Sequence, residues 1–361
     1  MVGMWRSGTS LLYALLNQHP QIALMYEAEL PVLWPLFWMP GRRRWAARWD
    51  LWNSALARHR IDLKPTPRDP CRLREACERV YKDYAARKGA CIWGEKSPNY
   101  YDCLTRIARQ FPNAKFILIW RSPLNVCGSV VRAAAQSSWF AKRGMVSRAL
   151  LGCKRMKVQC EWLIDRGIPV HQVNYEELIS DTAEVMTGVC EFLNIPFDVR
   201  MTSLNAADRS AVYEGAHHTL VKSEHLVAGG SQLELLSSEL RGKIERYLSL
   251  WREQHHGEWP KFPKPAAAGN TPKPSLAERG FDEVRYRLLR SFDLAVRLAY
   301  CASPLWVWKA YRGVKRQVSL QLTGNKKTPL PLESPQAGRR APEATIVPGK
   351  GSPQPPNSGS T

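Results

Sequence analysis

Long uninterrupted apolar runs are missing from the sequence. A helix that spans a membrane needs roughly 18 or more consecutive, predominantly apolar residues. The two most apolar stretches are interrupted, because Leu30–Met39 contains two prolines and Leu294–Trp308 contains Arg297 and Pro304. The sequence therefore predicts a soluble chain.

Paired cysteines are missing as well. The nine cysteines are odd in number, include no C-x-x-C pair and stand mostly among apolar neighbours. This pattern favours buried, reduced thiols over a disulfide framework and predicts a cytoplasmic protein. No His, Cys and Asp residues have the spacing of a metal site, so no metal is expected.

Acidic residues are scarce, since 32 Asp and Glu stand against 52 Lys and Arg and leave a net charge of +20. Such an excess says more about partners than about fold. Residues 121–160 include eight Lys or Arg and no acid, and residues 41–60 include six arginines interleaved with tryptophans. The arginine and tryptophan segment fits either an acceptor-binding wall or core packing.

The length of 361 residues and the hydrophobic share of 44% allow one large domain or two small ones, and exclude a wholly disordered chain. We expect a folded domain over residues 1–258, a proline-rich linker over 259–274, a basic helical extension over 275–322 and a disordered tail over 323–361. The part of the extension at 275–318 is suited to lie on an anionic membrane surface.

Strands and helices alternate along the first domain. Buried strands are expected at Ala90–Trp93, Lys115–Trp120 and Pro169–Asn174, and helices at Val146–Arg166 and Asp181–Leu193. This order predicts a three-layer α/β fold with a central parallel sheet covered by helices on both faces. In such sheets, ligands bind beyond the carboxyl ends of the strands.

A glycine-bounded turn, Gly3–Ser10, opens the chain and has the G-x-x-x-x-G spacing of a phosphate-binding loop. Thr9 stands where the loop of nucleotide triphosphatases has Lys, and the cation lies inside the turn at Arg6. The turn is therefore suited to an anion but not to the usual Mg-triphosphate. Nearly all of the strand expected before the turn is missing, which suggests a truncated start.

Two further cations follow predicted strands. Lys96 comes shortly after the Trp93 strand, and Arg121 follows the Trp120 strand with Ser129 eight residues on. Because parallel strands end at the same edge of a sheet, we expect Arg6, Lys96 and Arg121 to share one anionic ligand.

These residues resemble the family of sulfotransferases that use 3′-phosphoadenosine 5′-phosphosulfate (PAPS), in particular bacterial members and the tyrosylprotein and carbohydrate branches. Gly3–Ser10 resembles the 5′-phosphosulfate loop of this family, and Phe116–Trp120 with Arg121 and Ser129 resembles its 3′-phosphate motif. Val173–Leu178, followed by Phe192–Phe197, resembles the strand and helix that usually come after these motifs. The resemblance covers about residues 1–255 and implies a P-loop-like fold.

The resemblance also implies roles for individual residues. Glu27 would be the catalytic base, with Glu29 or Glu95 as alternatives. Lys96 and Arg6 would stabilise the negative charge that develops on the bridging oxygen and the sulfuryl oxygens. The residues that would bind the donor are Arg6, Ser7, Gly8, Thr9, Ser10, Arg121 and Ser129, together with Lys222 and Ser223 near the adenine.

The implied reaction moves a sulfuryl group from PAPS to a hydroxyl of a carbohydrate, tyrosine, lipid or small alcohol by in-line displacement. Two other classes fit less well. A P-loop kinase or nucleotide hydrolase would need the Lys that Thr9 replaces. A non-catalytic basic protein that binds nucleic acid or membrane would not explain cations at strand ends, and no nucleic-acid partner is expected. The oligomeric state stays open.

Overall fold

A computed structural model describes most of the first 254 residues. The described residues are 1–31, 53, 55–63, 72–137, 139–142, 144–208, 210–212 and 233–254, together with residues 288 and 295, and they belong to one compact unit that spans Met1–Trp308. The expected linker and tail, almost all of the basic extension and most of the arginine and tryptophan segment lie outside them. Lys222 and Ser223 do too. Among the described residues, no helix combines the length and apolar composition that a membrane span requires.

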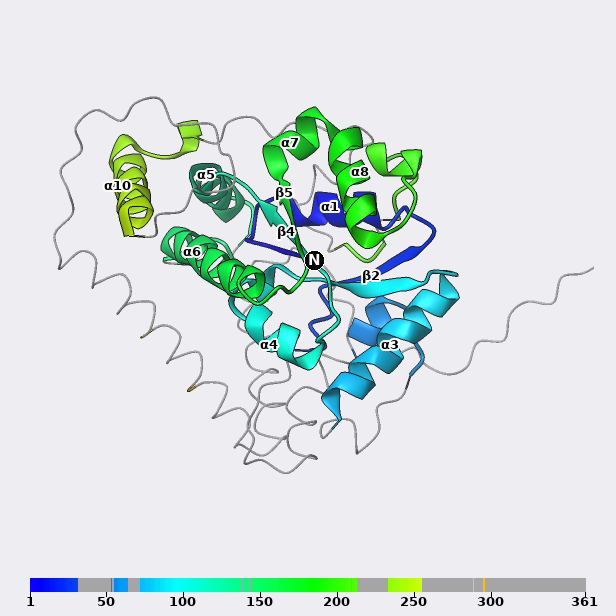
Figure 1. Ribbon diagram of the computed structural model, residues 1–361. Coiled ribbons are helices and arrows are strands. Elements are labelled where there is room, and N and C mark those ends of the chain that lie inside the picture. The colour runs from blue at the N-terminus through cyan, green and yellow to red at the C-terminus, as the bar shows by residue number, and fades with distance from the viewer. Residues whose placement is uncertain are drawn as a thin grey trace, which may run out of the picture. The chain divides into compact units, whose positions relative to one another are not determined.

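Five strands form the centre of the fold, and every pairing between them in the described part is parallel (Figure 1). They are β1 (Val2–Gly3), β2 (Ile22–Tyr26), β3 (Ile92–Lys96), β4 (Phe116–Trp120) and β5 (Val170–Asn174). The strands pair in the orders β1-β4-β5 and β2-β3, and a 3.3 Å backbone hydrogen bond from Ser97 to Met1 links the two groups.

Helices cover both faces of these strands. The helices are α1 (Thr9–Leu16), α3 (Leu73–Arg87), α4 (Leu104–Gln110), α5 (Pro123–Ala134), α6 (Met145–Ile164), α7 (Tyr175–Ser180), α8 (Thr182–Leu193) and α10 (Ser238–Gln254), with short 3₁₀ turns at Pro98–Asp102, Val199–Thr202 and Leu233–Leu235. Figure 1 shows α1, α7 and α8 on one side of β4 and β5, and α4, α5 and α6 on the other. The predicted three-layer α/β class is confirmed.

Strand β4 explains why this arrangement forms. Its side chains alternate between the faces, so that Phe116, Leu118 and Trp120 pack in the core beneath α4, α5 and α6. Ile117 and Ile119 pack in the core beneath α1 and α8. Because both faces of this strand are buried, its sequence is a continuous apolar run, and that run predicted the strand.

Strand β3 differs from the expectation. The apolar run predicted a strand that ends at Trp93, but β3 continues through Gly94 and Glu95 to Lys96. The strand is longer because its partner β2 supplies pairing for these polar residues, with Tyr26 opposite Lys96. Lys96 is therefore the last residue of a strand, not a loop residue. The expectation of a longer strand before Gly3 stays a prediction.

Candidate active site

The glycine-bounded turn follows β1 and leads directly into α1. Gly8 caps α1 with a φ of 90°, and Arg6 also lies in the left-handed region with a φ of 70°. Ser7, Thr9 and Ser10 are buried. Because the first N–H groups of a helix have no partner within it, this turn presents donors and a positive helix dipole to an anion.

Two arginines meet at the turn. Arg6 Nε donates a hydrogen bond to Ser129 Oγ on α5 at 3.0 Å, and Arg121 Nη1 donates to the backbone oxygen of Arg6 at 2.9 Å. The Arg121 guanidinium also lies over the ring of Tyr175, 4.3 Å from its centroid. Burial, and next the charge of Arg121, lower the pKa of Arg6 to about 10, so Arg6 stays charged at neutral pH. Two like charges that meet at one turn favour an anion between them.

Lys96 brings a third cation to the same region from the end of β3. Its Nζ lies 3.3 Å from Ser10 Oγ and 4.1 Å from the ring centroid of Tyr26. It also donates to Glu27 Oε1 at 2.5 Å, and only 1% of its side chain is exposed. Burial lowers the pKa of Lys96, and Glu27 raises it. Lys96 thus connects the turn to the carboxylate of Glu27.

The two neighbouring candidates for the base point to different partners. Glu27 follows β2, and its backbone N–H donates to the oxygen of Lys96 at 2.7 Å. Glu29 Oε1 instead accepts hydrogen bonds from Ser97 Oγ at 3.0 Å and from Asn99 Nδ2 at 2.5 Å. Glu95, the other alternative, accepts from Tyr81 on α3. The geometry therefore favours Glu27 as the carboxylate opposite Lys96.

The structure brings together most of the residues singled out in the sequence. The connected set consists of Arg6, Ser10, Glu27, Lys96, Arg121 and Ser129, and Ser7, Gly8 and Thr9 complete the turn. Sequence reasoning missed Tyr26, whose hydroxyl lies 2.8 Å from Ser10 Oγ. Among the described residues, no three His, Cys, Asp or Glu side chains are grouped to hold a metal ion.

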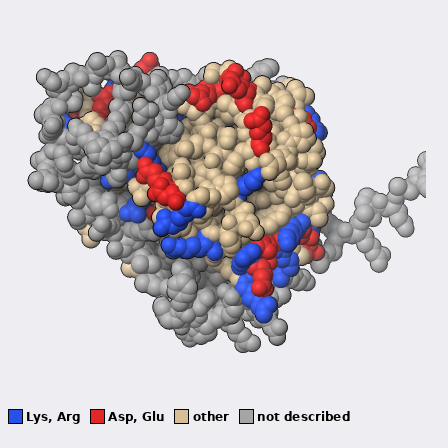
Figure 2. All heavy atoms as spheres, in the orientation of Figure 1, with Lys and Arg blue, Asp and Glu red and all other residues tan. Residues whose placement is uncertain are grey.

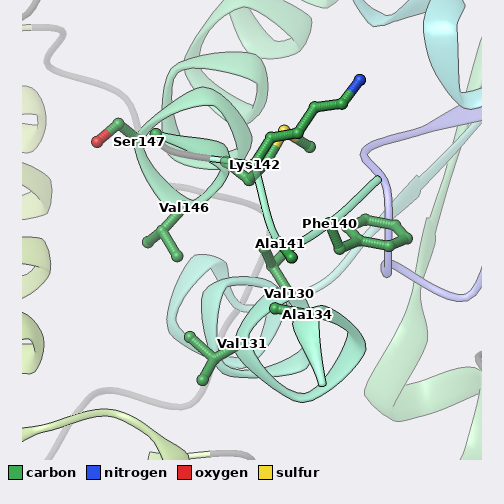
Figure 3. Close-up of a pocket in the computed structure, with 10 residues that line it drawn as sticks. Val130, Val131, Ala134, Phe140, Ala141, Lys142, Val146 and Ser147 are labelled. Carbon is green, nitrogen blue, oxygen red and sulfur yellow. The ribbon is translucent and has the colours of Figure 1, made fainter. Parts of the chain in front are cut away.

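A pocket lies beside this site, between α5 and the start of α6 (Figure 3). It has a volume of about 380 Å³ and is lined mainly by apolar side chains, with Lys142 at its rim. Phe140 belongs to both regions, because it lines the pocket and its ring centroid lies 5.8 Å from Arg6 Cζ. The pocket is an apolar neighbour of the cationic turn.

The surface carries acidic side chains as well as basic ones, whereas the turn gathers cations. Figure 2 shows acidic side chains over α7 and α8, and acidic and basic side chains intermixed over α3. On α3, Arg74 pairs with Glu78 and Arg87 with Asp83, each at 2.8 Å. On this face, therefore, many of the described basic side chains over α3 lie next to acidic ones.

Comparison with known proteins identifies the class. A model of the sulfotransferase family matches residues 1–199, more than half of the chain, and the protein belongs to this family. The chain is 26% identical over 201 residues to Protein-tyrosine sulfotransferase 1 of Danio rerio, a match that covers 54% of this chain and 52% of that protein. It is 26% identical over 265 residues to a Putative protein-tyrosine sulfotransferase of Caenorhabditis briggsae, with 69% of this chain and 78% of that protein covered. The chain thus spans about half the length of the first of these relatives.

Solved structures of sulfotransferases are also similar. The sulfotransferase domain of the curacin biosynthetic pathway has a TM-score of 0.45 at 18% identity, with 69% of this chain and 95% of that chain covered. The sulfotransferase domain of the Synechococcus PCC 7002 olefin synthase has a TM-score of 0.46 at 19% identity, with 72% and 94% covered. Family membership itself rests on the sequence match.

Proposed function

We propose that the protein transfers a sulfuryl group from PAPS to a hydroxyl group of an acceptor. The observation that carries the proposal is the meeting of three cations, the buried Arg121 and Lys96 and the partly buried Arg6, at the turn before α1, with Glu27 against Lys96. Sulfuryl transfer from a nucleotide needs this combination, because the donor carries several negative charges and the acceptor must lose a proton.

Two parts of the cationic region are suited to the two ends of the donor. Arg121 and Ser129 come from the end of β4 and from α5, and we assign them to the 3′-phosphate. The turn that contains Arg6 and leads into α1 is assigned to the 5′-phosphosulfate. Arg6 donates to Ser129, so the two subsites share a wall. A phosphate here would reduce the repulsion between Arg6 and Arg121.

The proposed reaction assigns opposite tasks to Glu27 and Lys96. The acceptor oxygen forms a bond to sulfur while the bond between sulfur and the bridging phosphate oxygen breaks, and the products are a sulfate ester and adenosine 3′,5′-bisphosphate. Glu27 takes the acceptor proton, which requires a distance of about 2.6–3.2 Å in the complex. Lys96 and Arg6 stabilise the charge that develops on the bridging and sulfuryl oxygens, and each key donor of this kind contributes about 3–4 kcal/mol.

Glu27 and Lys96 are bound to each other at 2.5 Å. We expect donor binding to draw Lys96 Nζ toward the bridging oxygen, which leaves Glu27 able to accept a proton. The pair would thus hold both groups in place until the donor is bound.

The acceptor proposed for the first test is a peptide tyrosine. Both curated relatives are named as protein-tyrosine sulfotransferases, one of them as putative. Carbohydrates, lipids and small alcohols are the alternatives, and incubation of the full chain with ³⁵S-labelled PAPS and one acceptor of each class distinguishes them.

Donor binding can be tested without knowing the acceptor. Adenosine 3′,5′-bisphosphate at 100 times its Kd should stabilise the full chain by about 2.7 kcal/mol. In a domain of this size, that corresponds to a rise in Tm of about 5–11 °C. Arg6→Ala and Arg121→Ala should lose most of the rise, whereas Arg74→Ala on the exposed face of α3 should keep it. ATP with Mg²⁺ should give a smaller rise.

Two results would contradict the proposal. One is a Tm that adenosine 3′,5′-bisphosphate does not change, and the other is a rise that survives both arginine substitutions. A larger rise with ATP and Mg²⁺ than with the bisphosphate would favour a kinase or nucleotide hydrolase instead.

A further inference from the structure

Glu95 is a buried carboxylate directly beside Lys96 on β3, and only 7% of it is exposed. Consecutive residues of a strand point to opposite faces. Lys96 accordingly reaches Ser10 in the turn, while Glu95 reaches Tyr81 on α3, whose hydroxyl donates to Glu95 Oε2 at 2.5 Å. The side chains of Glu95 and Lys96 therefore make contacts on opposite faces of β3.

The other partners of Glu95 belong to the segment that carries the proposed base. The backbone N–H of Glu29 donates to Glu95 Oε1, and that of Leu30 lies 3.4 Å from Oε2. We call residues 27–30 the base loop. Glu27 and Glu29 both have positive φ angles, 47° and 55°. Residues other than glycine rarely adopt such a conformation unless surrounding contacts hold it.

Separate contacts hold the start of the base loop. The backbone N–H of Tyr26 donates to His59 Nε2 at 3.0 Å, and Arg58 Nη1 donates to the oxygen of Tyr26 at 3.1 Å. Glu95 binds the backbone three to four residues further along the chain, at Glu29 and Leu30. The loop is thus fixed on both sides of Glu27.

The far side of the loop is also connected to the phosphate-binding turn. Asn99 donates to the Glu29 carboxylate at 2.5 Å and accepts a hydrogen bond from Trp5 Nε1 at 3.0 Å. Trp5 lies within the turn, next to Arg6. The base loop and the turn are therefore parts of one hydrogen-bonded frame.

We propose that Glu95 is a positioning residue for sulfuryl transfer, whose buried carboxylate binds the base loop and so holds Glu27 opposite Lys96. The inference rests on the role of Glu27 in the proposed function. An apolar side chain of similar size would leave the N–H groups of Glu29 and Leu30 without this acceptor, so the contacts with the base loop are what offset the cost of burying a carboxylate here. Burial raises the pKa of Glu95 to about 7, which reflects that cost.

Glu95→Met separates positioning from stability. Methionine fills the space but accepts no hydrogen bond, so the N–H groups of Glu29 and Leu30 lose their acceptor. Glu95→Gln is the conservative variant, because its amide oxygen can still accept from the loop. Glu78→Met on α3, whose carboxylate is 23% exposed and pairs with Arg74 away from the base loop, is the matched control.

Hydrogen exchange of the full chain tests the anchoring without any acceptor. In Glu95→Met we expect the backbone amides of residues 28–30 to exchange at least about tenfold faster than in the wild type. Glu95→Gln and Glu78→Met should exchange at nearly the wild-type rate. Unchanged exchange in Glu95→Met would overturn the proposal, whatever the activity.

Kinetics with PAPS and an accepted hydroxyl compound test the consequence. A displacement of about 1 Å can cost on the order of a hundredfold in rate, so we expect kcat of Glu95→Met to fall about 10–100-fold, with the KM for PAPS unchanged. Glu95→Gln should restore most of kcat. Faster exchange with an unchanged kcat would refute positioning. If the wild type transfers no sulfuryl group, the proposed function fails, and hydrogen exchange still decides whether Glu95 anchors the loop.

Tyr81→Phe tests the same contact more gently, should Glu95→Met not fold. It removes one donor to Glu95 and leaves the carboxylate in place. We expect the same changes in exchange and kcat at about two- to fivefold, and no change in either would count against the proposal.

Discussion

Removing the carboxylate of Glu27 is expected to destabilise the protein more than removing the ammonium group of Lys96. The two groups form an ion pair of 2.5 Å, but their surroundings differ, since 1% of the Lys96 side chain and 16% of the Glu27 side chain are exposed. In Glu27→Gln, a charged lysine stays buried in contact with Ser10 and the ring of Tyr26, and the charges of Glu29 and Glu95 act on it without an ion-pair contact. In Lys96→Met, the carboxylate left behind still reaches water.

The size of the difference follows from the cost of an uncompensated buried charge. Breaking a buried pair by removing one partner costs about 3–5 kcal/mol, which we expect for Glu27→Gln. Lys96→Met replaces the buried group by an apolar one of similar length and should cost about 0–2 kcal/mol. In a domain of this size, the loss for Glu27→Gln lowers Tm by about 6–20 °C.

The deficit should also depend on pH. Burial already lowers the pKa of Lys96, and Glu27 opposes that shift. Without Glu27 the pKa falls further, so below the ordinary lysine pKa of about 10.4 the folded protein binds fewer protons than the unfolded chain. The free energy of unfolding then rises with pH, and the deficit of Glu27→Gln should shrink as the pH rises toward the ordinary lysine pKa.

Urea unfolding followed by circular dichroism measures these values for Glu27→Gln, Lys96→Met and the double variant, which should be about as stable as Lys96→Met. Glu239→Gln is the control, because Glu239 and Lys243 are also 2.5 Å apart but are 78% and 65% exposed. Its unfolding midpoint should not move. A larger loss for Lys96→Met than for Glu27→Gln, or a deficit that does not shrink with pH, would refute the reasoning.

Three further predictions concern the turn, pH and metals. A Cβ at Gly8, where φ is 90°, would lie 2.4 Å from the Tyr175 ring, so Gly8→Ala should lower the free energy of unfolding by about 2–4 kcal/mol and abolish the Tm rise with adenosine 3′,5′-bisphosphate. Gly89→Ala, with a φ of 66° and open space, should cost about 1 kcal/mol and keep that rise. Burial raises the pKa of Glu95 to about 7 and lowers that of His59 to about 4. Between about pH 5 and 6.5, Glu95 therefore binds more protons in the folded protein than in the unfolded chain. His59 binds fewer protons in the folded protein than in the unfolded chain. Compared with the wild type, the free energy of unfolding should therefore rise more steeply with pH in Glu95→Gln and less steeply in His59→Asn. Over this pH range, the rise in each variant should differ from that of the wild type by about 1–2 kcal/mol, measured by urea unfolding. EDTA should leave the rate of sulfuryl transfer unchanged, and a loss that Mg²⁺ restores would contradict the proposed mechanism.

The fold was predictable where burial and chain order determine it. Strand β4 is buried on both faces, so its sequence is apolar throughout, and Arg121 marks its end. The end of β3 was not predictable from local sequence, because Glu95 and Lys96 are polar and their strand conformation depends on pairing with Met25 and Tyr26 of β2.

The candidate site was predictable to a similar extent. Arg6, Lys96 and Arg121 could be grouped from the sequence, because each follows or ends a parallel strand and such ends lie at one edge of a sheet. The choice between Glu27 and Glu29 could not be made in this way. It depends on Ser97 and Asn99, which lie about 70 residues further along the chain and bind Glu29.

The acid-free segment 121–160 shows why charge in a sequence does not measure charge in a site. Of its basic residues, Arg121 donates to the turn and Arg148 lies 5.6 Å from the ring centroid of Trp5 in the turn. Two others, Arg155 and Lys157 of α6, pair instead with Asp102 and Glu161, each at 3.4 Å. These pairs contribute little to the field at the turn, because each cation has an acid within ion-pair distance. An anion at the turn is therefore bound by a small number of cations at strand ends, and burial, which strengthens each interaction, makes those few sufficient.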